Sequence, residues 1–123
     1  PRSFHPPADF LSRFQSGRVT CEESLSNATK DADVIYTDVW VSMGKEDEAA
    51  DRLEFLEPYQ INQSIVALAK PKALVMHCLP AYRGKEITAD VLESHADTIF
   101  QEAENRLHVQ KAVLVRLAES QVS

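Results

Sequence analysis

One stretch in the middle of the chain, residues 74–84, constrains the fold more than any other. The segment 73–76 just before and within it is a short apolar run, typical of a buried parallel strand. His77 and Cys78 follow directly. Pro80 then ends the strand, because it has no N–H to donate to a neighbouring strand, and Arg83 lies in the turn that comes next. In an open α/β sheet, ligands bind at the carboxyl ends of the strands. A thiol, an imidazole and a guanidinium at such an edge predict part of an active site.

Segments typical of strands alternate with segments typical of helices along the chain. Short apolar runs predict the strands, and apolar stripes bounded by capping residues, proline or glycine predict the helices. Because this alternation is typical of βαβ units, we expect an α/β fold with a parallel sheet flanked by helices. The expected strands are 18–21, 34–37 and 73–76, with a short extended segment at 98–100. The expected helices are 8–15, 24–31, 45–56, 62–70, 87–94 and a terminal helix from 102 onward.

The expected terminal helix carries an apolar stripe and an arginine near its start. The spacing of the stripe is that of one helix face, which predicts that the helix docks on the sheet. Arg106 is expected to face the sheet edge, while a surface ion pair with Glu102 or Glu104 is the alternative interpretation. The stripe consists of Val109, Ala112, Val113 and Leu117.

Asp38 follows the expected strand 34–37 and opens a stretch, 38–44, that has no helical period and ends in glycine. Two interpretations of Asp38 are open. It could simply start a turn, as Asp commonly does, or it could belong to a functional loop, since loops on a rigid scaffold often carry function. Ser42 in this loop has no Gly-x-Ser-x-Gly context, so we do not interpret it as a nucleophile.

The composition limits the kinds of partner. The net charge is −6 and no basic tract offsets it, which argues against nucleic acid. No apolar run approaches the roughly 20 residues that span a bilayer, and no secretory signal opens the chain. We therefore expect Cys21 and Cys78 to be thiols in a reducing compartment, with Cys21 a small buried hydrophobe.

Two further chemistries are disfavoured by spacing. Structural zinc needs about four ligands at Cys-x-x-Cys or His-x-x-x-His spacing, and the chain has neither, so we expect no metal. A catalytic dyad of His77 with Cys78 is disfavoured because adjacent residues of a strand point to opposite faces. We expect His77 to be structural.

Three motifs, in the same order along the chain as in the family, resemble those of ornithine carbamoyltransferases. They are the His-Cys-Leu-Pro stretch that begins at His77, the Asp-x-x-x-Ser-Met-Gly loop that begins at Asp38, and the Glu-Asn-Arg that ends at Arg106. The resemblance implies that residues 1–123 are the C-terminal portion of the ornithine-binding domain. The fold would then be an incomplete Rossmann-like second domain, without the carbamoyl-phosphate domain or the first strands of its own domain.

The resemblance also implies the reaction and its residues. The carbamoyl group of carbamoyl phosphate passes to the δ-amine of L-ornithine, giving citrulline and phosphate, without a cofactor or a metal. Catalysis would rest on Cys78, Asp38 and Arg106. The amino-acid end of ornithine would be held by Asp38, Ser42 and Met43, and carbamoyl phosphate by Cys78, Leu79 and Arg106.

Assembly and location follow from the resemblance alone: a homotrimer, a cytoplasmic location and a place in arginine metabolism. Two alternatives remain open at this point. One is a carbamoyltransferase for another amine, such as putrescine, acetylornithine or aspartate. The other is a non-catalytic fragment that keeps only an ornithine-site surface, because missing central strands would leave open sheet edges and an uncovered core.

Overall fold

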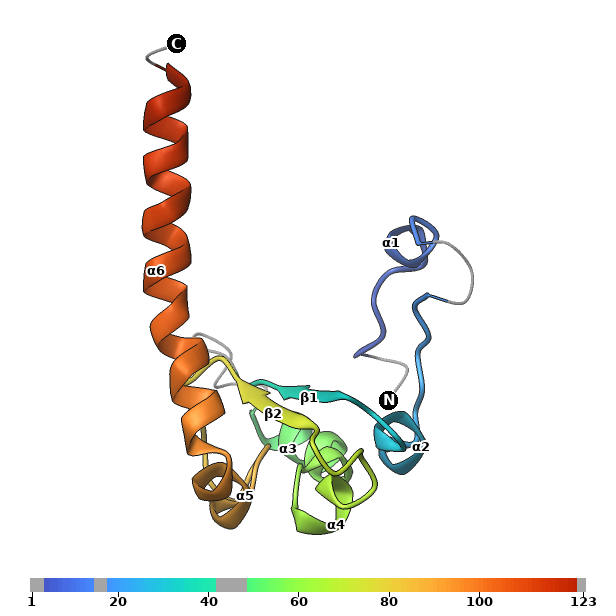
Figure 1. The fold of residues 1–123 in the computed structure, drawn as a ribbon. Helices are drawn as coiled ribbons and strands as arrows, with labels where there is room; N and C mark the ends of the chain where they lie inside the picture. Colours follow the sequence, from blue (N-terminus) through green and yellow to red (C-terminus); the bar gives the residue numbers. More distant parts are fainter. Residues whose placement is uncertain (1–3, 15–17, 42–48, 122–123) are drawn as a thin grey trace.

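The computed structural model describes residues 4–14, 18–41 and 49–121, and it places a small parallel sheet among helices (Figure 1). The α/β class is therefore confirmed. The first part of the chain contains α1 (Ala8–Leu11), α2 (Leu25–Thr29), β1 (Val34–Thr37), α3 (Ala49–Leu56) and the 3-10 helix η3 (Glu57–Tyr59). The second part contains α4 (Gln63–Val66), β2 (Leu74–His77), α5 (Ala89–Ser94) and α6 (Ala96–Gln121).

The two strands of the sheet run parallel, and their register sets the position of the site. Val34 pairs with Leu74 at one end, and Thr37 pairs with His77 at the other. The next residue on each strand is therefore Asp38 on β1 and Cys78 on β2. The carboxylate and the thiol predicted at the strand ends therefore lie at the same edge of the sheet.

The core lies on one face of this sheet. Ile35 and its register partner Val75 are buried, whereas Tyr36, the next residue along β1, is 56% exposed. Helices α5 and α6 supply further buried side chains, and the bridged residues Ile61 and Ile87 supply two more. Partly buried side chains of α2 and α4 pack against them. The buried members of the cluster are Ile35, Ile61, Val75, Ile87, Val91, Leu92 and Ile99.

Two short helices begin at caps typical of their sequence but end earlier than their patterns predict. Ser24 accepts from the Asn27 N–H at 3.4 Å, and Asn62 accepts from the Ile65 N–H at 3.1 Å. The expected helix 24–31 ends at Thr29 because Lys30 already has an extended ψ of 124°, and Asp31 follows with a left-handed φ of 57°. The Asp31 N–H donates to the Leu68 carbonyl at 2.9 Å. Leu68 lies beyond the end of α4 at Val66, so the expected helix 62–70 is also shorter than its pattern predicts.

Two other helices differ from their expected bounds at one end. The expected helix 8–15 ends at Leu11. The expected helix 87–94 begins only at Ala89, because Ile87 is in β-bridges with Ile61 and Arg83 and is fully buried.

The expected strand 18–21 was wrong. None of the described residues pairs with this segment, and a strand without a hydrogen-bonding neighbour does not form. Val19 is 46% exposed, and Cys21, expected to be buried, is also exposed. Both cysteines are free thiols.

The expected extended segment 98–100 was also wrong, since it lies in the first turns of α6. The Ile99 N–H donates to the His95 carbonyl at 3.1 Å, and the Ile99 side chain is buried in the core. Burial of this one side chain against α5 favours the helix over an extended run. Because α6 starts at Ala96, Arg106 lies well inside it and not near its start.

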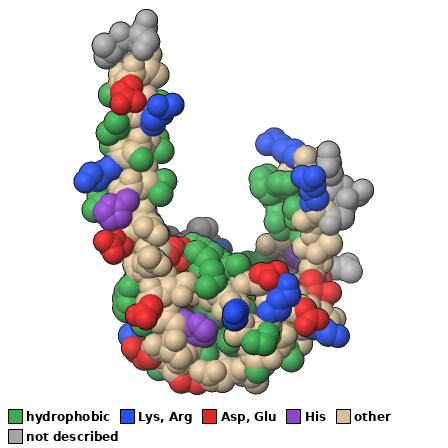
Figure 2. Space-filling view, viewed as in Figure 1, with side chains coloured by type: hydrophobic (Ala, Val, Ile, Leu, Met, Phe, Trp, Pro, Cys, Tyr) green, Lys and Arg blue, Asp and Glu red, His purple; other side chains and the backbone are tan. Residues whose placement is uncertain are grey.

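The apolar stripe of α6 does not dock on the sheet, contrary to the prediction. Val109, Val113 and Leu117 are 60%, 51% and 56% exposed. Only the first half of this 26-residue helix lies against β2, and the rest extends far beyond the sheet (Figures 1 and 2). The reason is that none of the described elements lies beside the second half of α6, so the stripe has no surface to pack on (Figure 1). None of the described helices is both long and apolar enough to cross a membrane.

Candidate active site

The site begins with a carboxylate and a thiol at the carboxyl edge of the sheet. The Cys78 thiol donates to Asp38 Oδ1, and the distance from Sγ to Oδ1 is 3.0 Å. The same oxygen accepts from the Val39 N–H at 2.7 Å, which fixes the carboxylate over the strand end. Asp38 is exposed and Cys78 half-buried, so both are open to a ligand from solvent.

Arg106 reaches the same place from α6. Its Nη2 donates to the carbonyl oxygen of Cys78 at 2.9 Å. Among the described residues it makes no ion pair with the two glutamates proposed as its surface partners: Glu104 lies 3.3 Å from His108, and Glu102 accepts from Tyr36. The three residues expected at one edge therefore converge there.

The surroundings of Cys78 favour the neutral thiol. Burial is the main cause that raises the pKa of this thiol, and the hydrogen bond and charge of Asp38 raise it further. The Tyr36 hydroxyl and the Arg106 guanidinium lower it in part. A neutral thiol is a hydrogen-bond donor and a weak nucleophile, which fits an orienting role better than covalent attack.

His77, the neighbour of Cys78, is completely buried. Its Nδ1 accepts from the Leu79 N–H at 2.9 Å, so the ring hydrogen is on Nε2, which lies 3.1 Å from Glu86 Oε1. Glu86 is also completely buried and accepts from the Tyr82 N–H at 2.6 Å. This buried pair fixes the turn after β2. Because both ring nitrogens of His77 already have hydrogen-bond partners, the ring is not available as a base for the Cys78 thiol.

Leu79 occupies an unusual backbone conformation next to the thiol. Its φ is +54°, a left-handed value that costs free energy in a residue with a side chain, and the peptide bond to Pro80 is cis. Since the Leu79 N–H is bonded to His77, only its carbonyl is available to a ligand. That carbonyl can accept a hydrogen bond from an amide NH2.

A metal ion fits this cluster poorly. The ligand atoms of Asp38, His77 and Cys78 lie within 4.8 Å of one another, as a metal site would require. However, both ring nitrogens of His77 are already hydrogen-bonded, one to Leu79 and one to Glu86. Binding a cation would break one of these buried hydrogen bonds, and the thiol would also have to lose its proton.

Other predicted residues lie apart from the cluster or outside the described part of the chain. Ser42 and Met43, predicted to hold the amino-acid end of ornithine, lie outside the described residues. Arg83 is paired with Glu93 at 2.7 Å, and both side chains are largely exposed.

Sequence reasoning missed one close contact of the site. The Tyr36 hydroxyl donates to Glu102 Oε1 at 2.7 Å, joining β1 to α6 across the edge of the cluster. The only sequence signals were positional. Tyr36 is two residues before Asp38 on the same face of a strand, and Glu102 is four residues before Arg106 on a helix.

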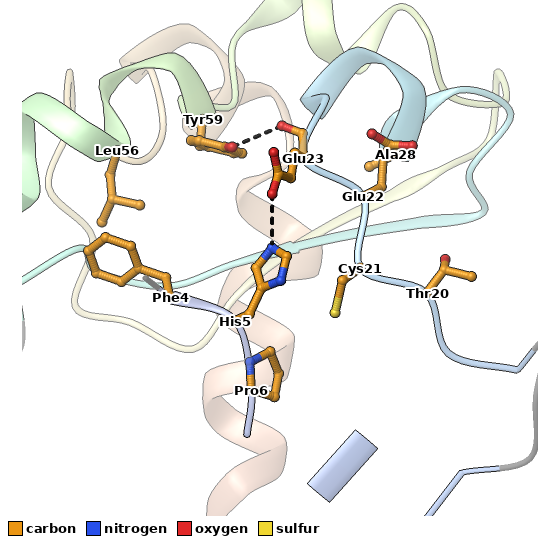
Figure 3. Close-up of a pocket in the computed structure, with 10 residues that line it drawn as sticks. All are labelled: Phe4, His5, Pro6, Thr20, Cys21, Glu22, Glu23, Ala28, Leu56 and Tyr59. Atoms are coloured by element: carbon orange, nitrogen blue, oxygen red, sulfur yellow. Dashed lines mark hydrogen bonds and ion pairs between the residues drawn. The ribbon is translucent and has the colours of Figure 1, made fainter. Parts of the chain in front are cut away.

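A separate hollow of about 510 Å³ opens between the N-terminal segment and η3 (Figure 3). His5 lies 3.7 Å from Glu23, and the Tyr59 hydroxyl donates to the Glu23 carbonyl at 2.9 Å. The exposed thiol of Cys21 lies on its wall. None of the predicted site residues lines this hollow. The candidate active site is therefore the cluster of Asp38, Cys78 and Arg106 at the sheet edge.

Comparison with known proteins agrees with this geometry. Residues 1–117 match the family model for the aspartate/ornithine carbamoyltransferase Asp/Orn-binding domain. The ornithine carbamoyltransferase of Methanoculleus marisnigri is 54% identical over 119 residues, covering 95% of this chain and 38% of that protein. Ornithine carbamoyltransferase from Thermus thermophilus superposes with a TM-score of 0.79 at 32% identity, covering 95% of this chain and 37% of that one. Anabolic ornithine carbamoyltransferase from Campylobacter jejuni gives 0.75 at 45% identity, covering 78% and 32%.

The chain thus spans less than two fifths of the length of these relatives. The family match nevertheless includes both strands, the carboxylate and thiol at their ends, and the arginine on α6. The chain belongs to the aspartate/ornithine carbamoyltransferase family.

Proposed function

We propose that this chain supplies the ornithine side of an ornithine carbamoyltransferase active site. The reaction transfers the carbamoyl group of carbamoyl phosphate to the δ-amine of L-ornithine and releases citrulline and phosphate. One observation carries the proposal: Asp38, Cys78 and Arg106, far apart in sequence, are joined by hydrogen bonds of 3.0 and 2.9 Å at one sheet edge.

The first requirement of the reaction is a neutral amine. By analogy with lysine, the δ-ammonium has a pKa of about 10.4 and must lose a proton before it attacks. The thiol of Cys78 already donates to Asp38, so a relay is possible in which sulfur takes the amine proton while the thiol proton passes to the carboxylate. No covalent bond to sulfur is needed.

The second requirement is stabilisation of developing negative charge. The amine nitrogen forms a bond to the carbonyl carbon of carbamoyl phosphate, and the bond from that carbon to the phosphate oxygen breaks. Arg106 offers a planar guanidinium to the carbonyl oxygen or to the departing phosphate. The carbonyl of Leu79, which accepts no hydrogen bond from the described residues, can accept from the carbamoyl NH2, which orients that group toward the amine.

In this proposal, the loop after β1 binds the amino-acid end of ornithine. Asp38 would accept from the α-ammonium, and Ser42 would serve either the ammonium or the carboxylate. The backbone N–H of Met43 would donate to the α-carboxylate. Such a loop suits an unblocked amino acid, which favours ornithine over acetylornithine or putrescine.

The wider assignments belong to the same proposal. The whole enzyme would be a homotrimer that acts in arginine metabolism in the cytoplasm, with ornithine and carbamoyl phosphate as substrates. Residues 1–123 would form the C-terminal portion of its ornithine-binding domain. The mass of the assembled enzyme, measured by light scattering after gel filtration, tests the trimer: a monomeric or dimeric mass for the active enzyme would exclude it.

A hybrid enzyme tests the activity. In it, this chain replaces the matching segment of the Methanoculleus marisnigri enzyme, to which it is 54% identical. We expect the hybrid to make citrulline from ornithine, and to use acetylornithine and putrescine at least roughly a hundredfold less well, since unpaired buried polar groups penalise the wrong substrate. A folded hybrid that prefers either competitor, or makes no citrulline, would contradict the proposal.

A further inference from the structure

We infer that Tyr36 is a positioning residue for the proposed reaction. Its hydroxyl donates a hydrogen bond to the Glu102 carboxylate, which would otherwise pair with Arg106, and so leaves Arg106 available to carbamoyl phosphate. The inference rests on the proposed function, because it assigns Arg106 to that substrate. It concerns a contact that the motifs do not contain, since neither Tyr36 nor Glu102 is part of any of the three.

The contact joins two elements that carry site residues. Tyr36 lies on β1, two residues before Asp38, and its hydroxyl is 2.7 Å from Glu102 Oε1 on α6. Glu102 lies four residues before Arg106 on the same helix. The tyrosine therefore holds α6 against β1 one turn away from the guanidinium.

The position of Glu102 makes it a natural competitor for Arg106. A glutamate four residues before a basic residue has the favourable arrangement for an ion pair within a helix. Yet among the described residues Glu102 makes no such pair, and the Arg106 guanidinium donates to the Cys78 carbonyl. The second carboxylate oxygen of Glu102 is buried and has no hydrogen-bond partner. This oxygen gains a partner if the carboxylate turns toward Arg106.

Tyr36 remains a donor at ordinary pH. The hydrogen bond to Glu102, followed by burial and by the charge of Glu102, raises the pKa of Tyr36 to about 12. The phenol therefore keeps its hydrogen wherever the enzyme works. A phenylalanine at this position would keep the ring but leave Oε1 of Glu102 without its donor.

The test is a rescue experiment in the hybrid enzyme. Tyr36→Phe should raise KM for carbamoyl phosphate about threefold to tenfold, the range expected for one competing ion pair or hydrogen bond. Adding Glu102→Gln should return KM to the value of Glu102→Gln alone, because the neutral amide does not capture Arg106. A merely structural tyrosine gives no such rescue. No change in Tyr36→Phe, or a loss that Glu102→Gln does not reverse, overturns the inference.

Tyr59→Phe is the matched control for the loss of a hydroxyl. Its hydroxyl donates at 2.9 Å to Glu23 in the hollow of Figure 3, away from the site, so its KM should stay that of the parent hybrid. An equal rise in KM in Tyr59→Phe would make the effect of Tyr36→Phe non-specific and would overturn the inference.

A second readout needs no catalysis and uses this chain itself. The side-chain N–H resonance of Arg106, followed by ¹⁵N NMR, should shift in Tyr36→Phe and return in the double variant with Glu102→Gln. An unshifted resonance in Tyr36→Phe overturns the pairing argument. An inactive hybrid would defeat the proposed function, whereas this measurement would still decide whether Tyr36 keeps Glu102 from Arg106.

Discussion

The two sides of the end of β2 differ sharply, although they are built from adjacent residues. On the inner side, His77 and Glu86 are completely buried and hold the Leu79 and Tyr82 N–H groups. On the outer side, Cys78 is half-buried, and its thiol bonds to the exposed Asp38. One side is a fixed support and the other is open to ligands.

This difference shows how a short strand can serve stability and chemistry at once. Alternation along a strand sends neighbouring side chains to opposite faces, so the support can lie directly beneath the group it positions. The inner hydrogen bonds fix the main chain of the turn after β2, and the Cys78 main chain in turn accepts from Arg106. We expect substitutions on the outer side to change catalysis and those on the inner side to change folding.

The largest effect should come from Asp38 on the outer side. In the hybrid enzyme, Asp38→Ala should lower kcat/KM roughly 10²- to 10⁴-fold, because the proton acceptor of the relay is lost. The free energy of unfolding should change by less than about 0.5 kcal/mol, since the side chain is exposed. Steady-state kinetics and urea denaturation measure the two quantities.

Asp33 provides the matched control for this variant. It lies just before β1, at the opposite end of the strand from Asp38, and pairs with Lys70 at 2.7 Å on the surface. Asp33→Ala should leave kcat/KM within about twofold, because a surface ion pair contributes little. A comparable loss of activity in both variants would break the contrast between the strand end and the rest of the surface.

The next largest effect should come from Glu86 on the inner side. Glu86→Ala should lower the free energy of unfolding by about 3 kcal/mol, because it leaves the Tyr82 N–H and the His77 ring without an acceptor in a buried site. Denaturant unfolding of this chain measures the change. Glu93→Ala, which removes only the exposed partner of Arg83, should cost less than about 1 kcal/mol. Equal losses in the two variants would mean that the buried pair is not a support.

A smaller effect should appear in the alkaline titration of Tyr36. The phenol absorbance should show a transition near pH 12 that Tyr36→Phe removes and that Glu102→Gln moves to lower pH, because Glu102 is its main cause. The folded protein holds this proton more tightly than the unfolded chain, so the contribution to stability is complete below about pH 10 and is lost toward pH 12. A transition unmoved by Glu102→Gln would contradict the contact with Tyr36.

Local patterns were sufficient to predict the parts of the fold that depend on neighbours in sequence. The strand ends at Asp38 and Cys78 followed from short apolar runs, and the cap at Asn62 followed from its residue type. Parallel pairing then brought the carboxylate and the thiol to one edge. Arg106 required the family motif, because its own surroundings in sequence fit a surface ion pair equally well.

The errors concern contacts between distant residues. The segment 18–21 has a strand-like sequence but no strand beside it in the described chain. Ile99 looked extended, yet its burial against α5 makes it helical. The partners Glu86 for His77 and Glu102 for Tyr36 lie on other elements, and no local period indicates them. A single sequence gives the polar residues but not these pairings.

The central claim is that Asp38, Cys78 and Arg106 surround one ligand site, and the two cysteines of the chain allow a direct test. Alkylation of the hybrid enzyme, followed by peptide mass spectrometry, gives the rates at Cys78 and at the exposed Cys21 separately, provided that the cysteines of the remaining sequence are tracked as well. We expect saturating ornithine with carbamoyl phosphate to slow alkylation of Cys78 at least tenfold, roughly as ligand occupancy at ten times Kd would, and to leave Cys21 unchanged. Equal rates at Cys78 with and without both substrates, in an enzyme that turns them over, would contradict the claim.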